Sequence, residues 1–173
     1  MPTTKRTSKS AFAPEDDPSS GQPSPEFLHG RALAMQARRE HSRQEIRQKL
    51  LDLGGLPLVV DSLLDALVQR RLQSDERFAE IYIRSRAERG YGPRVIEAEL
   101  RAKGLAAELQ EQALAASGYD WLEQAQLVRQ KRFGRVLPAE MRERARQMRF
   151  LQYRGFSGSH VSQALRCELP AED

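Results

Sequence analysis

Residues 42–55 have the sequence SRQEIRQKLLDLGG, and two later segments of the chain repeat its pattern. The segment opens with a capping box, in which the Ser42 hydroxyl accepts a hydrogen bond from the backbone N–H of Glu45 while the Glu45 carboxylate accepts one from the N–H of Ser42. A helix is therefore expected to begin here. The glycine pair at the end of the segment predicts where this helix stops.

The repetition has a spacing of about fifty residues and places apolar residues and a glycine at fixed intervals. Ile46, Leu50 and Gly54 recur as Ile96, Leu100 and Gly104, and Leu100, Lys103, Gly104 and Leu105 recur as Leu151, Arg154, Gly155 and Phe156. A cation, a glycine and an apolar residue in succession are typical of a helix C-terminus. The chain is thus interpreted as a module present in three copies.

Apolar residues from Phe27 onward are spaced three and four apart, without the alternation of a strand. The predicted fold is all-α, with three tandem three-helix repeats in an elongated array, straight or curved, after a disordered N-terminal tail. The expected boundaries are 1–26 for the tail and 27–73, 74–116 and 117–173 for the repeats. The helices are expected to start near Phe27, Ser42, Pro57, Ser74, Gly92, Ala106, Asp120, Pro138 and Ser157. The expected core stripes are Val60, Leu63, Leu64 and Leu67; Phe78, Ile81 and Tyr82; and Met141, Ala145 and Met148.

The predicted tail is rich in proline, serine and charge, and Pro14, Pro18, Pro23 and Pro25 oppose regular structure in it. No apolar run approaches the roughly 20 residues of a membrane span, and the N-terminus lacks the apolar core of a secretory signal. The single cysteine, Cys167, has no partner for a disulfide within the chain, and a small inert side chain is favoured over a reactive thiol. These features predict a protein of the reducing cytoplasm.

The sequence lacks the patterns of an active site. His29, His41 and His160 are far apart and have no Cys or carboxylate at ligand spacing, so no metal is expected. A nucleophile next to a base and a Gly-rich phosphate loop are also missing, so no catalytic residue and no cofactor are predicted. Asp75 and Glu76 follow a serine, where negative charge favours a helix start over a catalytic pair.

Basic residues recur where the first helix of each repeat is expected to end. The three segments are RREHS at 38–42, RSRAERGYG at 84–92 and RQKRFG at 129–134. Cations at a helix C-terminus stabilise its dipole by about 0.3 to 1 kcal/mol, which suffices to explain one such turn. Three copies, in a chain of net charge +4, favour a cationic track for a linear polyanion or an acidic protein surface. The candidate binding residues are Arg38, Arg39, His41, Arg43, Arg47, Arg84, Arg86, Arg89, Tyr91, Arg94, Arg101, Lys103, Arg129, Lys131 and Arg132.

Several longer motifs resemble the RecX family, and the resemblance extends from about Phe27 to Leu165. The motifs are ARREHSRQEIRQKL at 37–50, DERFA at 75–79, RSRAERGYGP at 84–93, RARQMRFL at 144–151 and RGFS at 154–157. The resemblance implies a monomer, without catalysis or cofactor, that docks in the helical groove of a RecA recombinase filament on single-stranded DNA. It further implies that docking restrains the ATPase and strand exchange of the recombinase.

Two other functions compete with this interpretation. A helix-turn-helix regulator of transcription would place the helix expected over 93–103 in a major groove, where Glu97 and Glu99 would face phosphates unfavourably. A peptide-binding solenoid would depend little on salt. A filament or nucleic-acid partner predicts an affinity that falls steeply between roughly 50 and 200 mM salt.

Overall fold

The structure is a computed structural model that describes residues 21–166 of the chain. Within this range all regular secondary structure is helical, and short connections join the helices. They are α1 (Pro25–Arg38), α2 (Arg43–Asp52), α3 (Pro57–Gln69), α4 (Asp75–Glu88), α5 (Pro93–Ala102), α6 (Ala107–Ala116), α7 (Trp121–Phe133), α8 (Met141–Tyr153) and α9 (Gly158–Ala164).

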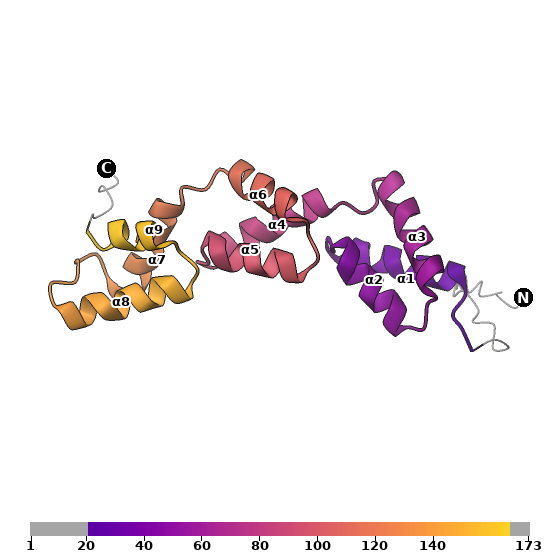
Figure 1. The fold of residues 1–173 in the computed structure, drawn as a ribbon, viewed down its shortest axis with the longest axis horizontal. Coiled ribbons are helices and arrows are strands. Elements are labelled where there is room, and N and C mark those ends of the chain that lie inside the picture. Colours follow the sequence, from indigo (N-terminus) through magenta and orange to yellow (C-terminus); the bar gives the residue numbers. More distant parts are fainter. Residues whose placement is uncertain (1–20, 167–173) are drawn as a thin grey trace, which may run out of the picture.

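Successive triplets of helices form three units, and each unit has its own small core. Ile46, Leu50 and Leu64 are among the buried residues of the first unit, α1–α3. Separate clusters fill the second unit, α4–α6, and the third, α7–α9. The units follow one another in a row, so that the molecule is elongated (Figure 1). The predicted fold class, all-α with three tandem three-helix repeats, is confirmed.

The helix ends follow from local chemistry that the sequence displays. Both hydrogen bonds of the capping box between Ser42 and Glu45 are present at the start of α2. Gly92 is the N-cap of α5, and a proline occupies the first helical position, where its missing N–H costs nothing. Gly104 and Gly155 follow the ends of α5 and α8 with φ values of 82° and 91°, which glycine adopts at little cost.

Two of the helix starts differ from the predicted positions by two or three residues. Helix α1 begins at Pro25, two residues before Phe27, because the Ser24 hydroxyl accepts a hydrogen bond from the Phe27 N–H at 3.2 Å. Pro25, expected to lie in the tail, is therefore part of the helix. Helix α8 begins at Met141 and not near Pro138, because an irregular loop precedes it.

Two predicted core residues lie at the surface. Ile81 is 51% exposed and Met141 is 81% exposed, so the buried faces of α4 and α8 are rotated away from them. Leu151 is buried on α8 and Phe78 on α4. Residues 1–20 of the predicted tail and Cys167 lie outside the described residues, as do 168–173 of the third predicted repeat.

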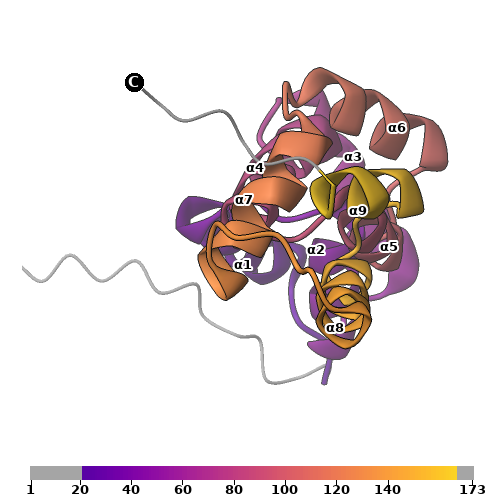
Figure 2. The same ribbon diagram turned by 90° about the vertical axis from the view of Figure 1, so that its left-hand side faces the viewer.

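The units are joined through the ends of their second helices. At the first junction the Ser42 hydroxyl, at the N-terminus of α2, donates to the carbonyl of Lys103 at the C-terminus of α5, at 2.8 Å. At the second junction the Gly92 N–H, at the N-terminus of α5, donates to the carbonyl of Arg154 at the C-terminus of α8, at 2.7 Å. The second helices α2, α5 and α8 are thus stacked end to end, and they lie on the same side of the array when it is viewed along its long axis (Figure 2).

Each junction requires a glycine for space as well as for conformation. A Cβ atom on Gly104 would lie 2.6 Å from the Cβ of Gln44, and one on Gly155 would lie 2.6 Å from the backbone nitrogen of Val95. Contacts this short cannot be accommodated without movement of the backbone. The glycine that ends a second helix therefore also admits the preceding unit.

The first junction also contains a partly buried charge. Glu45 is 17% exposed and accepts hydrogen bonds from Lys103 at 2.6 Å and from Arg39 at 3.3 Å. Burial raises the pKa of Glu45, but the hydrogen bonds and positive charges of these two groups outweigh it and lower the pKa to about 2. Glu45 thus stabilises the junction in its ionised form.

Replacing Gly155 with alanine is expected to destabilise the chain more than replacing Gly118. Both have positive φ, 91° and 72°, so each substitution strains the backbone, but a Cβ on Gly118 meets no atom within 4 Å. We expect the free energy of unfolding, measured by urea denaturation with circular dichroism, to fall by about 1 kcal/mol for G118A and by at least about 2 kcal/mol for G155A. Equal losses would show that the junction does not depend on close approach.

Stability is expected to fall as the pH is lowered from about 4.5 to about 2, because the pKa of Glu45 is lower in the folded chain than its ordinary value. The contribution is present above the unfolded pKa and is lost as the pH falls through the folded pKa. Melting temperatures measured across this range should decline less for Glu45→Gln than for the wild type. Glu111→Gln, at an exposed position of α6, is the matched control and should follow the wild type. Identical slopes for E45Q and wild type would contradict this role.

Candidate binding surface

Seven of the predicted binding residues form ion pairs within the chain. The pairs are Arg39 with Glu45, Arg43 with Asp65, Arg47 with Asp61, Arg84 with Glu80, Arg86 with Glu99, Arg101 with Glu97 and Lys103 with Glu45. The pairs that are exposed contribute only about 0 to 1 kcal/mol each to stability, whereas those of Arg86 and Lys103 are partly buried. Their carboxylates nevertheless weaken the positive field that these seven cations offer to an acidic partner.

Arg86 and Tyr91 belong to a cluster at the corner between α4 and α5. The Arg86 guanidinium donates to both carboxylate oxygens of Glu99, and this hydrogen bonding raises its pKa. It also lies 4.7 Å from the centroid of the Tyr91 ring, while the guanidinium of Arg154 lies 5.1 Å from the same centroid. Both predicted residues therefore stabilise the corner and the adjoining junction.

Arg129 is not a surface residue, and its prediction as an exposed cation was wrong. It is 2% exposed, and its guanidinium donates to the carbonyls of Gly134, Arg135 and Val136 at 3.0–3.3 Å. These bonds hold the loop that precedes α8. The cost of burying the charge is offset by satisfying backbone carbonyls that lack helical partners.

His41 is also enclosed, being 4% exposed. Its Nδ1 lies 2.9 Å from the carbonyl oxygen of Arg39, and burial lowers the pKa of its ring below the ordinary value. The backbone carbonyl of His41 accepts from Gln73 at 3.4 Å. His41 therefore stabilises the turn between α1 and α2 and has little surface to offer a partner.

The five remaining predicted cations make no side-chain hydrogen bond or ion pair within residues 21–166 and are exposed. They are Arg38, Arg89, Arg94, Lys131 and Arg132. These five cations do not form one continuous track along the three predicted basic turns. Arg89, Lys131 and Arg132 meet at the second junction, whereas Arg38 lies in the first unit.

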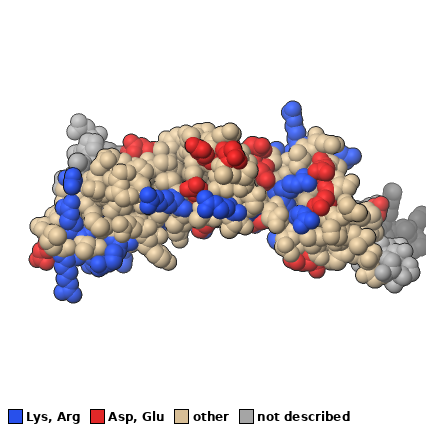
Figure 3. All heavy atoms as spheres, viewed as in Figure 1, with Lys and Arg blue, Asp and Glu red and all other residues tan. Residues whose placement is uncertain are grey.

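The sequence interpretation missed the arginines of α8. Arg142 and Arg149 are exposed and without an ion pair in the described range. Their signal was the charge balance: residues 120–166 contain ten Arg and Lys but four Asp and Glu, whereas residues 74–119 contain seven and eight. Figure 3 shows positive side chains over α5 and gathered over α8, while negative side chains lie over α6. The positive surface therefore follows the second helices and is strongest in the third unit.

A groove of about 540 Å³ lies where the second and third units meet, and we call it the junction groove. It is formed by the end of α4 and by parts of α7 and α8. Its lining combines apolar side chains, among them Leu127 and Val128, with the cations of Arg89, Lys131 and Arg132. It is thus both apolar and positively charged.

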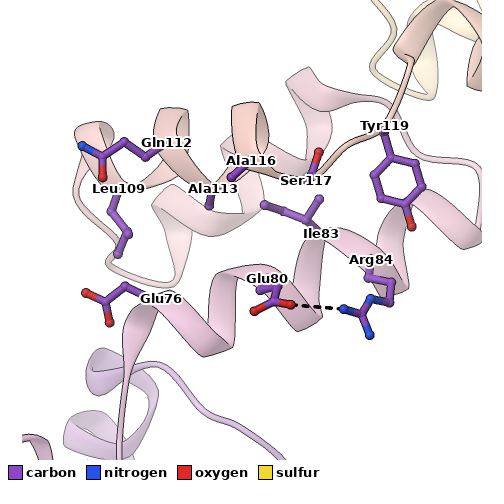
Figure 4. A pocket seen from close by; sticks show the side chains of 10 residues that line it. All are labelled: Glu76, Glu80, Ile83, Arg84, Leu109, Gln112, Ala113, Ala116, Ser117 and Tyr119. Carbon is purple, nitrogen blue, oxygen red and sulfur yellow. Dashed lines mark hydrogen bonds and ion pairs between the residues drawn. The ribbon is translucent and has the colours of Figure 1, made fainter.

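A second groove, of about 360 Å³, lies between α4 and α6. Ala113 and Ala116 leave space beside Ile83, because α6 carries small side chains where it faces α4 (Figure 4). Glu80 and Arg84 lie along its edge and pair with each other at 3.1 Å. The two grooves therefore differ in charge.

No group of three or more His, Cys, Asp or Glu side chains that could hold a metal ion occurs within residues 21–166. In the same part of the chain, no helix has the length and the apolar composition that crossing a membrane requires.

Proteins similar to this chain share both its sequence and its fold. A protein named Regulatory protein RecX from Halorhodospira halophila is 45% identical over 139 residues, which cover 80% of this chain and 86% of the relative. One of the same name from Pseudomonas savastanoi pv. phaseolicola is 45% identical over 125 residues, covering 72% and 81%. The crystal structure of RecX from Lactobacillus salivarius has a TM-score of 0.72 at 21% identity and covers 82% of this chain and 94% of that chain.

Family models match the second and third units separately. The second three-helix domain of RecX matches residues 74–114, which correspond closely to α4–α6. The third three-helix domain of RecX matches residues 118–165, which contain α7–α9. These matches, and the 45% identity over most of the length of the two relatives, show that the chain belongs to the RecX family of regulatory proteins.

Proposed function

We propose that this chain binds the filament of a RecA recombinase on single-stranded DNA and restrains the ATPase and strand exchange of that filament, and so modulates recombination and DNA repair in the cytoplasm. The RecX family is one of regulatory proteins and is not a family of enzymes. The observation that carries the proposal is the row of exposed arginines on the second helices α5 and α8, including Arg94, Arg142 and Arg149.

The geometry of the row suits a long, regular and acidic partner. The two second helices that carry the row, α5 and α8, contain 10 and 13 residues. Stacked end to end at about 1.5 Å per residue, they extend over about 35 Å. A filament repeats its subunits along an axis, so an array of this length can contact more than one repeat. Guanidinium groups match carboxylates and phosphates, and the row can contact either protein or DNA.

The competing helix-turn-helix interpretation requires the N-terminus of a second helix to enter a major groove. In α5 that end is occupied, because the N–H groups of Gly92 and Arg94 donate to the carbonyls of Arg154 and Gly155. The N-terminus of α2 is also occupied, because the Ser42 hydroxyl donates to the carbonyl of Lys103. Insertion of α2 or α5 into DNA would require a junction to open, which disfavours this function for these two helices.

Replacing Arg94 and Arg149 together with glutamate is expected to weaken inhibition of the DNA-dependent ATPase of the recombinase from the same organism by at least about tenfold, because two unpaired cations become anions. The matched control is R31E/R70E, which makes the same change of charge at exposed positions of the first unit that form no ion pair in the described range. The control should inhibit like the wild type, and both variants should keep the wild-type helical content by circular dichroism.

Inhibition should also weaken steeply between roughly 50 and 200 mM salt if phosphates are contacted. A wild-type protein that leaves the ATPase unchanged at large molar excess would refute the proposed function. Equal weakening by the two double variants would refute the role of the second-helix row and leave only a nonspecific effect of charge.

A further inference from the structure

The junction groove has a strong imbalance of charge. Glu88 is its only acidic lining residue, whereas four cations line it: Arg89, Lys131, Arg132 and Arg154. Arg154 already has structural partners, because it donates to the carbonyl of Arg89 at 3.1 Å and lies against aromatic rings. The other three cations make no side-chain hydrogen bond or ion pair in the described range. They are available to a ligand.

Helix ends alone do not account for these three cations. Arg89 is the C-cap of α4, and Lys131 and Arg132 lie in the last turn of α7, where a positive charge stabilises the helix dipole. None of them donates to a backbone carbonyl there; Arg129 and Arg154 do so instead. Three like charges that line one groove also repel one another, and a negatively charged ligand would relieve this repulsion.

The apolar part of the groove is aliphatic and accessible. Leu127 is 43% exposed although it lines the groove where two units meet, and Val128 lines the groove beside it. Gly90 lies close to Val128, since a Cβ atom there would be 3.0 Å from its Cγ2. An exposed leucine within a concave, positively charged site is typical of a place where a partner inserts an apolar side chain.

The aromatic rings near the groove are already in contact with guanidinium groups. Arg154 lies 5.3 Å from the centroid of Phe150 and also lies against Tyr91. Arg146 lies 5.4 Å from the centroid of Phe133, whose ring is edge-on to Phe150 at 5.2 Å. Proteins that bind single-stranded nucleic acid stack bases on aromatic faces. The composition of this groove therefore favours aliphatic side chains and carboxylates over nucleotides.

We propose that the junction groove binds an acidic segment of a partner protein, which places one apolar side chain against Leu127 and Val128 and its carboxylates on Arg89, Lys131 and Arg132. The inference rests on the proposed function for the choice of a protein filament as the partner, and it deepens that function by assigning one of its contacts to protein. The chemistry of the groove itself is independent of the recombinase and can be tested without it.

The test is the binding of a fluorescent synthetic peptide to the full-length chain, measured by anisotropy. The peptide consists of Asp and Glu with one central leucine, and a second peptide has serine in place of that leucine. We expect the leucine peptide to bind at least about tenfold more tightly than the serine peptide, because only leucine can use the apolar floor. Lys131→Glu and Leu127→Asp should each weaken its binding by at least about tenfold.

Matched controls make the same changes outside the groove. Arg31→Glu reverses an exposed, unpaired cation on α1, and Leu58→Asp replaces a leucine of the first unit that is 86% exposed. Both should bind the leucine peptide like the wild type. If L127D fails to fold by circular dichroism, the comparison of K131E with R31E still measures the contribution of charge. The comparison of the two peptides on the wild type still measures the apolar contribution.

Three results would overturn the proposal. The first is equal affinity for the two peptides. The second is weak peptide binding together with tight binding of a single-stranded oligothymidylate that K131E abolishes, which would assign the groove to phosphates. The third is peptide binding only when Glu168, Glu172 and Asp173 are replaced by their amides, which would identify the chain's own C-terminal residues as the occupant. Peptide binding without any inhibition of the recombinase ATPase would instead refute the proposed function and leave the groove assignment intact.

Discussion

The end-to-end contact between second helices is the constraint from which the shape of this protein follows. A helix N-terminus carries N–H groups without intrahelical partners, and a C-terminus carries carbonyls in the same condition. At the second junction these groups satisfy each other, because Gly92 and Arg94 donate to Arg154 and Gly155. The positive end of one helix dipole also meets the negative end of the next. Units joined in this way must follow one another in a single direction, and their second helices must share one side of the molecule.

The two junctions solve the same problem with different chemistry, and this difference determines where free cations remain. At the first junction, side chains supply most of the contacts between the units: Lys103 pairs with Glu45, and Arg77 donates to Glu40 at 2.9 Å. The cations at this junction are therefore paired with carboxylates of the same chain. At the second junction, backbone groups supply most of the contacts, and Arg154 is the main side chain involved. The basic residues around it are left unpaired, although the sequence shows comparable basic segments at both places.

The sequence predicted what local chemistry controls and failed where distant residues decide. The capping box at Ser42 and the positive φ of Gly104 depend on a few neighbouring residues, so both could be predicted. The second role of Gly104, which is to admit Gln44 from another unit, depends on a contact across sixty residues and left no local signal. In sequence Arg129 resembles the other basic turn residues. Its guanidinium is nevertheless buried, because it donates to three carbonyls of the long loop after α7. That loop also delays the start of α8 beyond Pro138.

The uneven distribution of charge also limits how the array can lie on a partner. The second unit is nearly neutral, and the groove between α4 and α6 has Glu76 and Glu80 at its edge, whereas the third unit has a large excess of arginine. An acidic partner is therefore attracted mainly to the third unit and the second junction, and it is not attracted to the face formed by α6. Since the second helices lie on one side and α6 on another, attraction favours one orientation of the array. The stacking of the second helices thus fixes the order of the units and also the side from which an acidic partner can approach.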